Sequence, residues 1–104
     1  MRTEEMLKKL EGFDWDKGNV EKSKQKHNVA IKECEEIFFN RPLLINFDLK
    51  HSEKEKRFQV LGKTNKDRKL FLVFTIRNKL IRVISARDQS REERKVYEKN
   101  KRTA

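Results

Sequence analysis

Two apolar runs in the second half of the chain dominate its pattern of hydrophobic and polar residues. They cover residues 70–76 and 80–86, and the polar residues 77–79 separate them. The runs consist largely of Leu, Phe, Val and Ile, which suit a pleated and buried surface. Two such runs around a short polar segment predict a β-hairpin.

A two-residue turn at 78–79 would place Thr75 opposite Arg82, and this register fixes both faces because side chains alternate along a strand. The face expected in the core carries Leu70, Leu72, Phe74, Ile76, Ile81 and Val83. The other face carries Phe71, Val73, Thr75, Arg77, Arg82 and Ile84. Guanidinium groups on a rigid sheet suit a phosphate. Arg82 could equally be an ordinary sheet residue that reaches solvent or a carboxylate, and a one-residue slip would exchange the faces.

Shorter patterns predict three more strands. Residues 13–16, FDWD, alternate, so Phe13 and Trp15 would pin a short edge strand. Residues 43–49 and 57–62 alternate as well. The side chains expected to face the core are Leu43, Ile45 and Phe47 in the first segment and Phe58 and Val60 in the second, with Arg57 and Gln59 on the other side.

The remaining segments predict helices or polar connections. One helix begins near Val29, has an apolar stripe and ends before Pro42, because proline disfavours helix at the preceding residue. The stripe consists of Ala30, Cys34, Ile37 and Phe38. Capping-box spacing predicts a helical turn at Ser52 and Glu55, and a final basic helix from Ser90 and Glu93 that buries only Val96 and Tyr97. Residues 1–12 are expected to be a flexible extension or a frayed helix, and 17–26 a solvated helix or loop.

Length and charge narrow the possible functions. A chain of 104 residues forms one domain. Only 35% of the residues are hydrophobic and 42% are charged, so the core must be small. The 27 Lys and Arg residues against 17 Asp and Glu give a net charge of +10, which favours nucleic acid or an acidic protein as partner.

Several kinds of chemistry find little support. The single cysteine, Cys34, excludes an internal disulfide and a four-cysteine zinc site, and we expect it to be a small buried hydrophobe. His27 and His51 have no carboxylate or cysteine at a familiar ligand spacing, so we expect no metal or cofactor. No apolar stretch reaches the roughly 20 residues needed to span a bilayer. The N-terminus lacks the apolar core of a signal peptide, and we expect a soluble cytoplasmic protein.

The residue types do suit RNA cleavage without a metal. In this reaction the 2′-hydroxyl attacks the neighbouring phosphate, so the site needs a base, an acid and cations around the phosphorus. His, Glu, Tyr or Lys can move the protons, and Arg can hold the charge. The candidate residues are His51, Glu53, Arg57, Arg82, Arg87 and Tyr97.

Five separated segments between residues 13 and 98 resemble the BrnT-type toxins of bacterial type II toxin-antitoxin systems. They are FDWD at 13–16, Lys26-His27 followed by Val29, HSEKEKRFQVLG at 51–62, the pair FTIR and IRVISAR, and REERK followed by Tyr97-Glu98. Two positions depart from the family pattern: Asn28 replaces a glycine, and Phe74 replaces a tyrosine. The first twelve residues lie outside the resemblance.

The resemblance implies a RelE-like ribonuclease that cleaves messenger RNA and arrests translation, and a BrnA-type antitoxin that wraps the toxin and supplies the DNA-binding part. We therefore expect an α+β fold with a small, mostly antiparallel sheet flanked by helices. Expected RNA-binding residues are Thr75, Arg77, Arg91 and Arg94, beside the catalytic candidates above. His51 could act in catalysis or cap its turn, whereas His27 is expected to be structural. The alternative is a non-catalytic basic module that binds nucleic acid or a protein.

Overall fold

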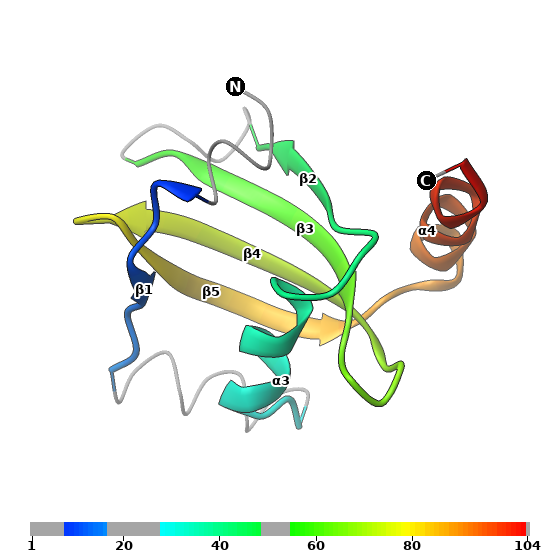
Figure 1. The fold of residues 1–104 in the computed structure, drawn as a ribbon, viewed down its shortest axis with the longest axis horizontal. Coiled ribbons are helices and arrows are strands. Elements are labelled where there is room, and N and C mark those ends of the chain that lie inside the picture. Colours follow the sequence, from blue (N-terminus) through cyan, green and yellow to red (C-terminus); the bar gives the residue numbers. More distant parts are fainter. Residues whose placement is uncertain (1–7, 17–27, 49–54, 104) are drawn as a thin grey trace.

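The computed structural model describes residues 8–16, 28–48 and 55–103, and for 101–103 the backbone alone (Figure 1). The elements with described bounds are β1 (Gly12–Phe13), α3 (Ile31–Ile37), β2 (Leu44–Phe47), β3 (Arg57–Lys63), β4 (Lys69–Arg77), β5 (Leu80–Asp88) and α4 (Arg91–Thr103). The predictions for residues 1–7, for 17–26 and for the turn at Ser52 lie outside the described residues, as do His27, His51 and Glu53.

The five strands form one mixed sheet in the order β1-β5-β4-β3-β2. Neighbouring strands from β2 to β5 are antiparallel, but β1 runs parallel to β5, so the predicted mostly antiparallel sheet is wrong in this respect. A tight turn enforces antiparallel pairing only between consecutive strands, and β1 lies far from β5 in the sequence. The backbone N–H of Asp14 donates to the carbonyl of Ile81 at 2.8 Å and holds the segment along β5.

The central hairpin forms with the predicted register. Thr75 pairs with Arg82 and Phe74 with Val83. The turn residues Asn78 and Lys79 have φ angles of 51° and 65°. Positive φ at both positions is the requirement of a type I′ turn, which matches the twist of the two strands.

A β-bulge interrupts the hairpin beyond Val83. Phe74 pairs with Val83 and Val73 with Ser85, so Ile84 is an extra residue without a partner in the ladder. A ladder without this bulge would instead pair Ile84 with Val73. A bulge shifts the alternation of side chains by one residue. As a result, Arg82 and Arg87 share a face of the sheet although they are five residues apart.

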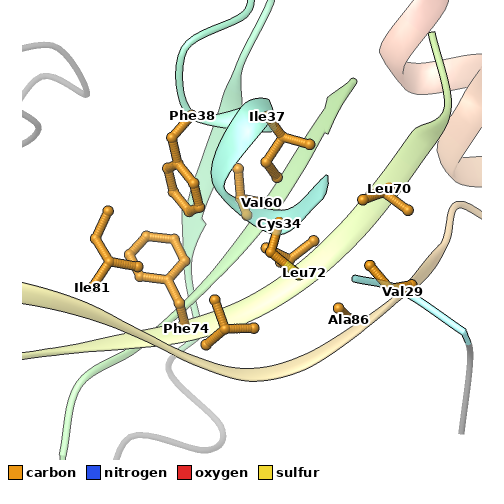
Figure 2. Close-up of a cluster of buried hydrophobic side chains, with 11 residues drawn as sticks. Val29, Cys34, Ile37, Phe38, Val60, Leu70, Leu72, Phe74, Ile81 and Ala86 are labelled. Carbon is orange, nitrogen blue, oxygen red and sulfur yellow. The ribbon is translucent and has the colours of Figure 1, made fainter. Parts of the chain in front are cut away.

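The hydrophobic core lies between α3 and one face of the sheet, where the helix and strand side chains meet (Figure 2). Cys34, Ile37 and Phe38 are buried there as predicted, but Ala30 is the exposed N-cap residue and Val29 takes its place in the core. Gly62 permits this close packing, because a Cβ there would lie 2.9 Å from the Cβ of Ile37. Burial raises the pKa of the Cys34 thiol to about 12, as expected for an inert core residue.

The β2 edge of the core is less well covered. Leu43 and Ile45 pack against it as predicted. Phe47, expected on the same face, is 44% exposed and meets the ring of Phe58 edge-on at 5.7 Å. Phe58 in turn stacks on Phe74, so aromatic contacts continue inward from this edge.

Helix α4 lies beyond the end of the sheet at which β5 finishes (Figure 1). Its predicted capping box is present: the Ser90 N–H donates to Glu93 Oε1 at 2.8 Å, and the Glu93 N–H donates to Ser90 Oγ at 3.2 Å. Tyr97 is fully buried, whereas Val96 is half exposed, so the seam that holds α4 is narrower than predicted. None of the described helices is long and apolar enough to cross a membrane.

Candidate functional site

The sheet face opposite α3 carries five of the ten predicted site residues, which are Arg57, Thr75, Arg77, Arg82 and Arg87. The ladders align Arg57, Thr75 and Arg82 across β3, β4 and β5, and we call this set the arginine row. Four residues along β4, the same ladders align Leu61, Phe71 and Arg87. At about 3.3 Å per residue the two rows are separated by about 13 Å. The predicted catalytic arginines therefore fall into two groups.

Arg82 is held by two carboxylates from the segment after β1. Its Nη2 lies 2.6 Å from Asp16 Oδ2, its Nη1 lies 3.6 Å from Asp14 Oδ2, and its side chain is only 18% exposed. Phe13 and Trp15 pack on the core, and the Trp15 Nε1–H donates to Glu35 at 3.0 Å. The alternating FDWD segment thus uses its aromatic residues as anchors and its acidic residues as partners of Arg82.

A second pair extends this cluster. Arg77 donates two hydrogen bonds to Glu55, at 3.0 and 3.1 Å. These bonds, together with the charges of Arg77, Arg57 and Arg82, lower the pKa of Glu55. Three guanidinium groups and three carboxylates therefore act on one another at the turn end of the sheet face, and we call them the turn-end cluster: Arg57, Arg77, Arg82, Asp14, Asp16 and Glu55.

Thr75 lies in the middle of the arginine row but is buried. Its hydroxyl donates to the carbonyl of Lys56 at 2.6 Å. Because this is a short hydrogen bond to the residue just before β3, Thr75 fixes the start of that strand. Thr75 thus supports the strand that carries Arg57, and the RNA contact expected from the sequence stays a prediction.

Arg87 belongs to a different environment. Its guanidinium lies over the Phe71 ring, 4.1 Å from the centroid, and donates to both oxygens of Glu93 at 2.7 and 3.0 Å. These hydrogen bonds raise the pKa of Arg87 and lower that of Glu93. Arg87 thereby joins the sheet face to the first turn of α4.

Tyr97 is remote from solvent on the inner side of α4. Its hydroxyl donates to the carbonyl of Pro42 at 2.6 Å, and burial raises the pKa of the phenol to about 12. This geometry describes an anchor that ties α4 to the connection before β2. Arg91 and Arg94, by contrast, are exposed on α4 and form no ion pair within the part of the chain that the structure describes.

A family model of the "Ribonuclease toxin, BrnT, of type II toxin-antitoxin system" matches residues 15–93, well over half of the chain. The chain belongs to the BrnT family of ribonuclease toxins. For a BrnT toxin the family implies an RNA substrate and an antitoxin protein as partner. A comparison with curated proteins finds no match.

Asp14 and Asp16 are two members of the turn-end cluster that were not expected from the sequence to be site residues. The alternation of FDWD already placed both opposite the aromatic anchors, but only the pairing of β1 with β5 brings them to Arg82. Within residues 8–16, 28–48 and 55–103 the BrnT chain has no group of three His, Cys, Asp or Glu residues suited to a metal ion. The chemistry that the turn-end cluster does support is anion binding by arginine and proton transfer by carboxylates.

Proposed function

We propose that this toxin is an endoribonuclease that cleaves messenger RNA without a metal ion, by attack of a ribose 2′-hydroxyl on the adjacent phosphate. The observation that carries the proposal is the arginine row. Neighbouring strands are about 4.8 Å apart, so the Cα atoms of Arg57 and Arg82 flank Thr75 at about 10 Å from each other. Two arginine side chains at that spacing are long enough to meet on one phosphate.

In this proposal the arginines stabilise the negative charge that develops on the pentacoordinate phosphorus. Preformed cations aimed at developing charge contribute more than cations that must reorganise during the reaction. The ion pairs with Asp14 and Asp16 orient Arg82 in advance. A guanidinium group has five N–H donors, and the ion pairs with Asp14 and Asp16 each involve one nitrogen of Arg82, so other donors of Arg82 would face a phosphate.

Proton transfer is assigned to residues close to the start of β3. His51 and Glu53 are our proposed acid and base candidates, and Glu53 precedes Glu55 of the turn-end cluster by two residues. We leave Tyr97 out of the catalytic set because its hydroxyl is committed to Pro42.

The residues outside the arginine row are proposed to guide the RNA strand. Arg77 belongs to the turn-end cluster, Arg87 and Phe71 lie about 13 Å along the sheet face, and Arg91 and Arg94 follow at the start of α4. A line of cations interrupted by an aromatic residue is a feature of proteins that bind single-stranded nucleic acid. Translation arrest would follow from cleavage of messages along this line.

The proposed partner is a BrnA-type antitoxin that covers the toxin and carries the DNA-binding part of the complex, so that the pair represses its own operon. We also propose that the fold is RelE-like. Co-expression with a BrnA-type antitoxin should restore growth and give a complex that copurifies. Arrested growth despite expression of that protein would contradict this choice of partner.

The enzymatic proposal is tested by incubating purified toxin with RNA in EDTA. We expect fragments that end in a 2′,3′-cyclic phosphate, because the 2′-oxygen displaces the 5′-oxygen of the next nucleotide. RNA that stays intact at several salt concentrations, while the toxin binds it and causes no growth arrest, would instead identify a non-catalytic binding module.

A further inference from the structure

A cavity of about 630 Å³ lies between the first turns of α4 and the end of the sheet where β4 begins. Four cationic side chains line it: Lys69, Arg91, Arg94 and Lys95. It also contains the carboxylates of Asp67, Asp88 and Glu98, and the first two of these have cationic partners. Asp67 accepts from Lys69 at 2.7 Å, and Asp88 accepts two hydrogen bonds from Arg68, at 2.7 and 3.1 Å.

The arginines of this cavity differ from those of the turn-end cluster. Arg91 and Arg94 have exposed side chains and form no ion pair with any residue that the structure describes. Guanidinium groups that are not neutralised bind phosphate oxygens without first breaking a protein ion pair. The cavity therefore presents two arginines ready for an anion.

Gln89 supplies an independent observation. This residue lines the cavity and is only 6% exposed, and its Nε2 donates to the carbonyls of Leu70 at 3.1 Å and Gly62 at 3.3 Å. Its Oε1 is buried and accepts no hydrogen bond among the described residues. The two donated bonds explain why the amide is buried, but they leave its oxygen without a donor. A buried acceptor of this kind costs about 1–3 kcal/mol unless a donor arrives.

We propose that this cavity binds one nucleotide of the RNA strand, with a backbone phosphate on Arg91 and Arg94 and a base N–H donated to Gln89 Oε1. The inference rests on the function proposed above and deepens it. Lys69 lies six residues from Thr75 along β4, so the cavity is about 20 Å from the arginine row. The nucleotide is therefore distant from the cleaved bond, and the cavity acts in substrate binding.

The phosphate part is tested with a fluorescent 12-mer RNA whose 2′-hydroxyls are all methylated, which keeps it intact whether or not the toxin is an enzyme. The double variant R91A/R94A should bind it about tenfold more weakly than wild type in moderate salt. Lys99→Ala is the matched control, because it removes a charge from the same helix outside the cavity. If each lost charge weakened RNA binding equally in both variants, the proposed phosphate site would be overturned, and the helix would attract RNA only through its overall positive charge.

The base part is tested with a 12-mer that has the same sugar-phosphate backbone but no bases. Wild type should bind the complete 12-mer several-fold more tightly, and Gln89→Met should remove this difference while still binding the abasic strand. Because that variant loses two hydrogen bonds, the side-chain amide signals of Gln89 in the wild-type NMR spectrum provide a second readout. They should shift on saturation with the complete 12-mer alone, and unchanged signals would overturn the base contact.

These binding assays separate the two proposals. Intact RNA in the EDTA assay together with arginine-dependent and base-dependent binding here would reject the enzymatic proposal and retain the cavity as a nucleotide site. Cleaved RNA, together with RNA binding that does not depend on Arg91, Arg94 and Gln89, would retain the enzymatic proposal and reject the cavity as a nucleotide site.

Discussion

The arginines at the two ends of the sheet face differ in whether they form ion pairs. At the turn end, Arg82 and Arg77 are bound to Asp16 and Glu55, and their geometry is fixed. At the α4 end, Arg91 and Arg94 are exposed without an ion pair among the described residues. Paired arginines supply orientation, whereas unpaired arginines supply long-range attraction for an anion. The difference separates a place suited to chemistry from a place suited to binding.

The largest effect is expected when the turn end loses its central cation. Arg82→Ala should lower the rate of RNA cleavage by about a hundredfold or more, because the charge on the phosphorus loses a preformed partner. Cleavage of a defined RNA under single-turnover conditions measures this. Arg82→Lys should cleave at a rate between those of wild type and Arg82→Ala. The control is Arg41→Ala, which changes an exposed arginine after α3 and should cleave at the wild-type rate. Undiminished cleavage by a folded Arg82→Ala protein would remove the arginine row from the site.

A smaller loss is expected when Arg82 keeps its charge and loses its orientation. Asp16→Asn should lower the rate constant by about tenfold while RNA binds as well as before or better, because a negative charge has left the site. Separate measurement of the rate constant and of RNA affinity reveals this split. Glu11→Gln, an exposed change of equal charge in the same segment, is the matched control. Weaker RNA binding in Asp16→Asn would contradict the assigned role.

Tyr97 tests whether the α4 end contributes to stability or to chemistry. Tyr97→Phe removes only the hydroxyl that donates to Pro42, and it should lower the free energy of unfolding by about 1 kcal/mol. Denaturant titration measures this change. At denaturant concentrations well below the unfolding transition, Tyr97→Phe should still cleave RNA. A variant that no longer cleaves RNA but is as stable as wild type would return Tyr97 to the catalytic set.

The smallest effect concerns the ion pair that joins the two regions. The hydrogen bonds from Arg87 lower the pKa of Glu93, so this carboxylate stabilises the fold above its ordinary pKa. That contribution is lost as the pH falls through the lowered pKa of the folded state. Glu93→Gln should therefore cost up to about 1 kcal/mol at neutral pH and almost nothing in strong acid. Glu92→Gln, an exposed change in the same turn, controls for net charge in unfolding experiments across this pH range.

The sequence predicted the features that depend on nearby residues. The hairpin register follows from the alternation of the two apolar runs and from the turn at Asn78 and Lys79. Both the alternation and the turn depend only on residues that are close in the sequence. The same holds for the capping box of Ser90 and Glu93, whose side chain and backbone meet within one helical turn. The strand at 57–62 was predictable because its alternation is regular.

Features that depend on distant contacts could not be predicted in this way. The faces of Asp14 and Asp16 followed from the alternation of FDWD, but the neighbour of that segment is a strand almost seventy residues later. Tyr97 has the chemistry of a catalytic residue, and only the docking of α4 against Pro42 shows where its hydroxyl goes. The parallel pairing of β1 with β5 likewise could not be predicted, because no turn connects these two strands directly.

The bulge at Ile84 has a consequence for how the toxin gene can change. An in-frame loss of that one codon would make Ser85 follow Val83 directly, so that the two strands alternate regularly and Arg87 stays opposite Phe71. Because every other pair of the ladder would be kept, the link between the sheet face and α4 would survive this deletion. The position of Arg87 thus depends on the bulge that takes up the extra residue, and β5 can lose that residue without turning Arg87 away from Glu93.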